Sequence, residues 1–209
     1  DVAKEFCDRG FTCHSVIANL GDAESLKNGF EDAVKSLGGH LDIIVNGAGV
    51  QKRHPSEEFP YEDWEFVLNI NLNAVFRLCQ LAGKQFMAQG SKGKIINIAS
   101  MLSFFGGFTV PAYAASKGGV AQLTKALCNE WAGKGINVNA LAPGYMDTEM
   151  NTALTDPSNP RFKEITDRIP AHVWGTPEDM KGPCVFLASA ASDYLNGAII
   201  PVDGGYLVK

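Results

Sequence analysis

Three side chains between residues 100 and 117 have the types and spacing needed to move a proton to or from an alcohol oxygen. Tyr113 and Lys117 are four residues apart, so in a helix both side chains leave the same face one turn apart. An ammonium near a phenol favours the phenolate, and we expect Lys117 to lower the pKa of Tyr113 from its usual value of about 10. Tyr113 is therefore a candidate general acid and base. Taken alone, such a pair is more often an accident of the surface, so the surrounding elements decide.

Ser100 is the third of these side chains. It follows a continuous apolar run at residues 94–99, a pattern that predicts a buried parallel strand. Open α/β sheets bind their ligands at the carboxyl ends of strands, where the Ser100 hydroxyl can hydrogen-bond a substrate oxygen. The segment after Pro111 is expected to be the helix that carries Tyr113 and Lys117.

Strands and helices alternate along the rest of the chain. We expect strands at residues 11–18, 41–45, 136–141 and 197–202, and helices at 22–37 and about 61–89. A helix start is also indicated by Thr176-Pro177-Glu178-Asp179. This order predicts an α/β fold with a Rossmann-like, doubly wound parallel sheet and helices on both faces, in a single domain spanning residues 1–209.

Four elements of the sequence resemble the short-chain dehydrogenase/reductase family. The family's Asn, Ser, Tyr and Lys tetrad is matched by Asn71, Ser100, Tyr113 and Lys117. An element that flanks the cofactor is matched by Asn46-Gly47-Ala48-Gly49, with glycine in place of the usual second asparagine. A turn that contacts the nicotinamide end is matched by Pro143-Gly144 and, four residues on, Thr148, and the family's terminus by Val202-Asp203-Gly204-Gly205.

The resemblance implies an oxidoreductase that transfers hydride between NAD or NADP and a carbinol or carbonyl carbon. Tyr113 would exchange the hydroxyl proton, Ser100 would hold the same oxygen, and Lys117 would also bind the nicotinamide ribose. Asn71 would anchor a water for proton relay, and Asn19 occupies a place near the adenine ring. The resemblance also implies a substrate-covering lid at about residues 146–173 and a homotetramer.

A narrower likeness, to enzymes of the 2-deoxy-D-gluconate 3-dehydrogenase type, rests on residues 95–104, 142–146 and 167–171. It implies a sugar acid such as 2-deoxygluconate or a keto-deoxygluconate as substrate, and it favours NAD over NADP. A carboxylate substrate calls for a cation in the site. Arg53 is our first candidate, with Arg161 or Lys163 second, and Tyr145 is a candidate pocket wall. Arg53 can equally be part of a solvated loop tip.

The glycine-rich turn that holds a dinucleotide's pyrophosphate is not found in this sequence. Residues 1–10 resemble the end of the helix that precedes the third strand of the family fold. We therefore expect the first two strands and the glycine turn to be missing. Two alternatives to the sugar-acid enzyme stay open: a reductase of neutral polyols or ketones in the same family, and a non-catalytic truncated fragment or scaffold.

Composition narrows the class of partner. A net charge of -5 over 209 residues argues against nucleic-acid binding. No apolar stretch reaches the roughly 20 residues of a membrane span, and no leader pattern precedes the first residues, so we expect a cytoplasmic protein. The five cysteines form an odd set without CxxC spacing, which favours buried thiols over disulfides or a metal site.

Overall fold

A four-stranded parallel sheet forms the centre of the computed structural model, which describes residues 2–209. Its strands are β1 (Ile43–Asn46), β2 (Gly93–Ile98), β3 (Ile136–Pro143) and β4 (Ile199–Val202), hydrogen-bonded in that order. Each of these strands lies where the apolar runs predicted one. Because neighbours in a parallel sheet need a crossover, the connections between them carry the helices.

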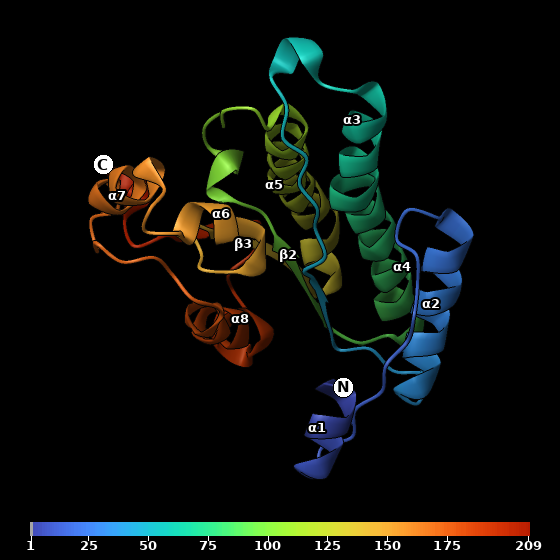
Figure 1. Cartoon of the computed structure of the whole chain (residues 1–209). Coiled ribbons are helices and arrows are strands. Elements are labelled where there is room, and N and C mark those ends of the chain that lie inside the picture. Colours follow the sequence, from blue (N-terminus) through green and yellow to red (C-terminus); the bar gives the residue numbers. More distant parts are fainter. Residues whose placement is uncertain (1) are drawn as a thin grey trace.

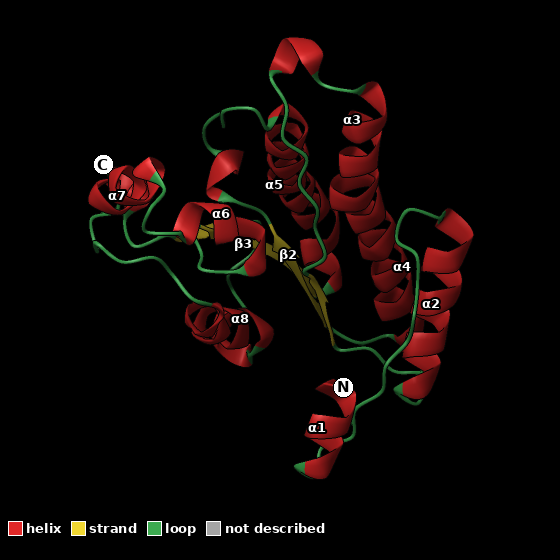
Figure 2. Cartoon of the chain, viewed as in Figure 1, coloured by secondary structure: helices red, strands yellow, loops and turns green. Residues whose placement is uncertain are grey.

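Helices cover both faces of the sheet, as the doubly wound prediction requires (Figure 1). One face carries α2 (Ala23–Ser36), α4 (Ala74–Gln89) and α5 (Pro111–Trp131), and the other carries α8 (Lys181–Ala188). Successive residues of β2 point to opposite faces. Ile95 packs in the cluster that contains Phe86 of α4, whereas Ile96 packs with Leu187 of α8. Figure 2 shows the strands as a thin layer between these helices.

The helix predicted at about residues 61–89 is continuous but changes its winding in the middle. It consists of α3 (Tyr61–Leu68), a π-helical turn η2 (Asn69–Asn73) and α4. Single π-turns inside α-helices are frequent at functional sites because the extra residue redirects a side chain. Asn71, fully buried, lies in this turn.

The strand predicted at residues 11–18 is not formed. After α1 (Val2–Asp8) the chain runs without helix or ladder hydrogen bonds to the start of α2, and Ile17 is 99% exposed. A strand is stable only when a neighbour takes its backbone N–H and C=O groups. None of the described strands pairs with this segment. Its apolar residues alone therefore do not make it a strand.

A long excursion, here called the 146–175 segment, leaves the sheet after β3. Its ends are joined by a bridge between Met146 and Gly175, and it contains η5 (Glu149–Asn151), α6 (Thr152–Thr155) and α7 (Pro160–Arg168). Ile165 and Ile169 of this segment pack against Met101, in a small cluster separate from the main core.

Short turns complete the fold. The helix start predicted at Thr176 is confirmed as a capping box, although the first turn, η6 (Pro177–Met180), is 3-10 rather than α-helical. The other 3-10 turns are η1 (Ser56–Glu58), η3 (Met101–Ser103), η4 (Ala132–Lys134), η7 (Ala190–Ser192) and η8 (Tyr206–Val208). Within residues 2–209, no helix has the length and apolar character needed to cross a membrane.

Candidate active site

The structure brings Ser100, Tyr113 and Lys117 together at the carboxyl edge of the sheet. Pro111 opens α5, which places Tyr113 in the first turn and Lys117 one turn later. The Lys117 Nζ lies 5.7 Å from the centroid of the Tyr113 ring. Ser100 follows β2 and caps η3, its Oγ accepting a hydrogen bond from the Leu102 N–H at 3.1 Å. All three side chains line one cavity.

Burial controls the ionisation of both groups on α5. It raises the pKa of Tyr113, and a hydrogen bond with the Ser100 hydroxyl opposes part of that rise. Our expectation that Lys117 lowers the pKa of Tyr113 was wrong for this structure. The ammonium lies over the ring and donates to the Ile98 carbonyl at 2.6 Å, and burial lowers the pKa of Lys117 itself to about 8.

Asn71 fastens the loop after β1 to the helix that carries Tyr113. Its Oδ1 accepts from the Val50 N–H at 2.8 Å, and its Nδ2 donates to the Val50 carbonyl at 2.9 Å and to the Ser116 hydroxyl at 3.1 Å. Gly49 is thereby held close, since a Cβ added to it would lie 3.7 Å from the Lys117 Nζ. The relay water that the family resemblance implies stays a prediction.

Two cavities meet at the catalytic candidates. One, of about 440 Å³ and here called the apolar cavity, extends from Lys117 over the sheet edge. The other, of about 370 Å³ and here called the arginine cavity, extends under the 146–175 segment. Ser100, Tyr113, Gly144 and Asn151 line both. A molecule in one cavity can therefore react with a molecule in the other across these residues.

The apolar cavity contains most of the residues that we expected to bind the cofactor. Gly49, Lys117, Pro143, Gly144 and Thr148 all line it, together with Ile98, Leu141, Met146 and Met180. Gly144 also fills a place where a larger residue does not fit, because a Cβ there would lie 2.7 Å from the Asp203 backbone. A flat ring fits such a lining, and glycine lets the backbone approach it closely.

Three expected cofactor residues have other surroundings. The Asn46 side chain points into the core, where its Nδ2 donates to the Asn97 Oδ1 at 2.8 Å and contacts Cys79. Asn19 is exposed and accepts from the Gly21 N–H at 3.0 Å in the turn before α2. Ala48 lies between two glycines of the loop, both of which line the apolar cavity. Asn19, Asn46 and Ala48 are not among the described residues that line the two cavities.

The arginine cavity has a charged mouth and an aromatic wall. Arg53 borders it from the loop after β1, and α7 contributes Arg161, Glu164 and Arg168. Phe105, Tyr145 and Tyr206 form an aromatic part of the lining, with Tyr206 5.8 Å from Phe105 and 5.4 Å from Tyr145 between ring centroids. The Arg168 guanidinium lies over the Tyr206 ring, 4.5 Å from its centroid. Arg53 borders this cavity and is also exposed, so its role as the carboxylate clamp stays a prediction.

The charged stripe on α7 was only partly found from the sequence. Arg161, Glu164 and Arg168 are spaced i, i+3 and i+7, so they share a helix face. That spacing was the signal that could have identified Glu164 and Arg168 in advance. Lys163, our other candidate, lies outside this face and pairs with Asp167 on the exposed side of α7.

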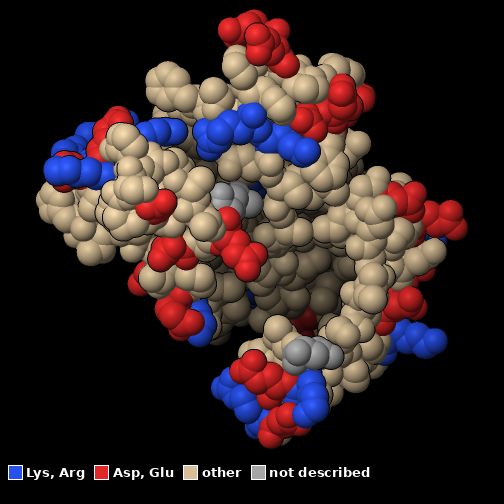
Figure 3. All heavy atoms as spheres, viewed as in Figure 1, with Lys and Arg blue, Asp and Glu red and all other residues tan. Residues whose placement is uncertain are grey.

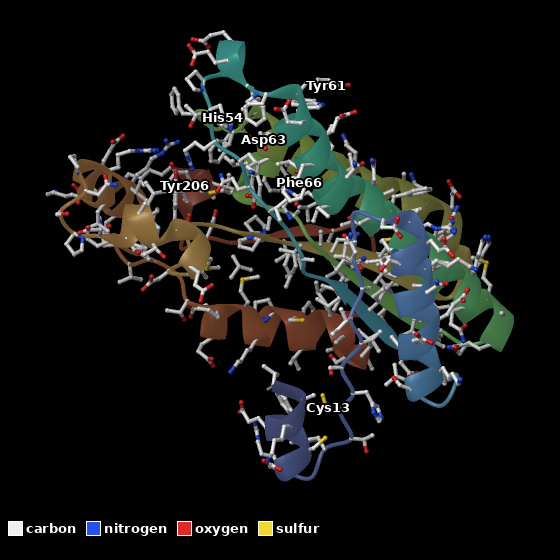
Figure 4. All side chains as sticks on the ribbon, turned by 45° about the vertical axis from the view of Figure 1, so that its right-hand side comes forward. Cys13, His54, Tyr61, Asp63, Phe66 and Tyr206 are labelled. Carbon is white, nitrogen blue, oxygen red and sulfur yellow. The ribbon has the colours of Figure 1, made fainter. Side chains whose placement is uncertain are left out.

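Backbone and side-chain bonds fix the loop that carries Arg53. The Arg53 Nη1 donates to the Phe108 carbonyl at 3.2 Å and to the Thr109 hydroxyl at 3.1 Å. The neighbouring His54 Nε2 lies 2.8 Å from the Asp63 Oδ2 of α3, a contact that Figure 4 places beneath the start of that helix. Figure 3 shows basic side chains in a band that runs from α7 toward this loop.

Comparisons with known proteins confirm the family resemblance. A family model described as "Enoyl-(Acyl carrier protein) reductase", which is a short-chain dehydrogenase/reductase model, matches residues 2–207. The chain is 52% identical over 195 residues to a 2-dehydro-3-deoxy-D-gluconate 5-dehydrogenase of Escherichia coli K12, an alignment that covers 93% of this chain and 76% of the relative. A namesake from Bacillus subtilis is 55% identical over 195 residues, covering 93% and 75%.

A solved structure is similar over the whole chain. It is a gluconate 5-dehydrogenase from Burkholderia cenocepacia J2315 in complex with NADP and tartrate. The TM-score is 0.93 at 39% sequence identity, and the superposition covers 100% of this chain and 80% of that one.

Proposed function

The chain belongs to the short-chain dehydrogenase/reductase family, and from that premise we propose that it interconverts a secondary alcohol and a ketone of a sugar acid, with NAD(P) as hydride partner. One observation carries the proposal. Ser100 and Tyr113 lie where an apolar cavity suited to nicotinamide meets a cavity with arginines at its mouth. The substrate named for the bacterial relatives, a keto-deoxy sugar acid, combines a reactive carbinol with a carboxylate.

The chain's own groups supply the proton chemistry. Nicotinamide, when bound, supplies or accepts the hydride. In reduction the Tyr113 hydroxyl donates its proton to the ketone oxygen, and its raised pKa keeps that proton in place at neutral pH. Ser100 holds the same oxygen. In oxidation the hydroxyl proton of the substrate passes to Tyr113, so the phenolate form of Tyr113 is the general base.

Lys117 and Asn71 prepare the cofactor side of the site. The Lys117 ammonium has three N–H donors, and within the described part of the chain it donates to the Ile98 carbonyl. Its remaining donors are available to ribose hydroxyls in the apolar cavity. Asn71 holds the loop that contains Gly49 against α5, which keeps that cavity open for a ring.

The form of the dinucleotide is a separate question. We expected NAD from the sequence, but NADP is the form bound to the Burkholderia relative. Titration of both forms against the same protein is therefore the measurement to make. We propose further that the protein is a cytoplasmic homotetramer. Phe66 of α3 and Phe76 of α4 are half-exposed in the single chain, and contacts between subunits would bury them. Analytical ultracentrifugation would measure the oligomeric state.

Tyr113→Phe tests the proposed chemistry directly. The substitution removes the proton donor but keeps the ring, so we expect kcat to fall by about 10² to 10⁴ while nicotinamide binding, measured by fluorescence, is unchanged. Tyr61→Phe is the matched control, because Tyr61 is an exposed tyrosine of α3 (Figure 4). Turnover of sugar acids by the Tyr113 variant at the wild-type rate would refute the assignment.

A further inference from the structure

Three guanidinium groups border the arginine cavity, together with the Glu164 carboxylate. Arg168 lies over the Tyr206 ring, 4.5 Å from its centroid, whereas the described residues place no aromatic ring under Arg53 or Arg161. Arg53 approaches from the loop after β1, and Arg161 from the first turn of α7. Across residues 2–209, neither arginine takes part in an ion pair. Burial lowers the pKa of Arg53, repulsion from Arg161 lowers it further, and Tyr145 opposes part of that shift. Both side chains line the same cavity, so their charges oppose each other across it.

Neighbouring basic residues differ in this respect. Lys52, beside Arg53 in the chain, lies 3.2 Å from the Asp63 Oδ1, and Lys163 on α7 pairs with Asp167. The Arg53 Nη1 contacts only uncharged oxygens, those of Phe108 and Thr109. These contacts orient the guanidinium but leave its charge uncompensated. A bound anion would compensate this charge.

A single carboxylate matches the two arginines. It has two oxygens and about four acceptor positions, so it can accept charge-assisted hydrogen bonds from both guanidinium groups. Placed between them, it replaces a repulsion with two attractions. The two arginines come from different parts of the chain, the loop that Asp63 anchors through His54 and the helix α7. A shared anion therefore connects these parts.

We propose that Arg53 and Arg161 bind one substrate carboxylate between them and that this shared anion fastens α7 over the arginine cavity. The inference rests on the proposed function, from which it takes a substrate with a carboxylate. It goes further because it makes closure of the 146–175 segment depend on the charge of the substrate. A neutral polyol of the same length leaves the repulsion in place and α7 unfastened.

Hydrogen exchange of the α7 backbone amides is the test. NADP is present in every sample, and the probes are D-gluconate and the neutral D-glucitol. At about ten times its Kd, gluconate should slow exchange of α7 about tenfold in the wild-type protein, because opening then requires ligand release. Glucitol should leave exchange of α7 unchanged. Arg53→Gln, a substitution outside α7, should abolish the slowing within α7, as should Arg161→Gln.

Lys163→Gln is the matched control, because it removes a cation of the same helix that pairs with Asp167 outside the cavity; gluconate should still slow exchange there. Equal slowing by glucitol, no slowing by gluconate, or undiminished slowing in Arg53→Gln would overturn the shared-anion proposal. Turnover of sugar acids on the same samples separates the two proposals. Turnover without slowing of α7 refutes only the shared anion, whereas absence of turnover for all sugar acids refutes the proposed function.

Discussion

The charge of Lys117 should cost the folded protein stability at neutral pH. The residue is 4% exposed, and burial lowers its pKa from 10.5 to about 8. Between these two values the unfolded chain binds more protons than the folded one, so the free energy of unfolding rises with pH across that window. Below about pH 8 the full cost is present. It amounts to about 3 kcal/mol, taking about 1.4 kcal/mol for each tenfold change in proton affinity.

Lys117→Met isolates this effect. Methionine has a similar length and no charge, and every other titrating group is common to both proteins. The stability of wild type relative to the variant should therefore increase by about 2 to 3 kcal/mol from pH 7 to pH 10. Loss of the bond to the Ile98 carbonyl shifts the difference at both pH values together.

Urea unfolding of both proteins at pH 7 and pH 10, with reductant for the free cysteines, measures the difference. Lys125→Met, at an exposed position of the same helix, controls for the loss of a lysine. A difference between wild type and Lys117→Met that stays constant from pH 7 to pH 10 would refute the reasoning. A constant difference would mean that interactions in the folded protein offset the whole free-energy cost of burying the Lys117 ammonium.

Two further substitutions test how the site is held. Asn71→Ala leaves the Val50 N–H and carbonyl without their partner, so we expect a loss of about 2 to 5 kcal/mol in urea unfolding; Asn73→Ala, exposed in the same turn, should cost far less, and equal losses would contradict the clamp. Gly144→Ala places a Cβ against the backbone of Asp203, so we expect about 1 to 3 kcal/mol of destabilisation and weaker nicotinamide binding in a titration. Unchanged stability and binding would mean that the turn relaxes freely.

Local spacing together with the surrounding elements predicted that Ser100, Tyr113 and Lys117 come together in the candidate site. The i, i+4 spacing of Tyr113 and Lys117 fixes their common face once the segment is helical, and the apolar run before Ser100 fixes its place at a strand end. Neither feature depends on a distant contact. The ionisation of Tyr113 does depend on such contacts, because burial raises its pKa against the opposing hydrogen bond with Ser100. Spacing along the chain carries no measure of burial.

Features that depend on distant partners were predicted less well. The segment at residues 11–18 has the composition of a strand, but a strand forms only beside a neighbour that the sequence pattern does not reveal. Asn46 follows an apolar run as a cofactor residue would, yet its amide pairs with Asn97 of the adjacent strand. Arg161 and Lys163 differ in the face of α7 on which they lie, and only Arg161 lies on the cavity side. The helix period could have distinguished these two faces in advance.

The meeting of two cavities at one pair of hydroxyls has a stereochemical consequence. Ser100 and Tyr113 hold the reacting oxygen at the boundary between the apolar and arginine cavities, and the arginines hold the far end of the substrate in the proposed complex. With two points fixed, only one face of the carbonyl carbon is turned toward the apolar cavity. Reduction of a prochiral ketone by this protein should therefore yield a single epimer of the alcohol.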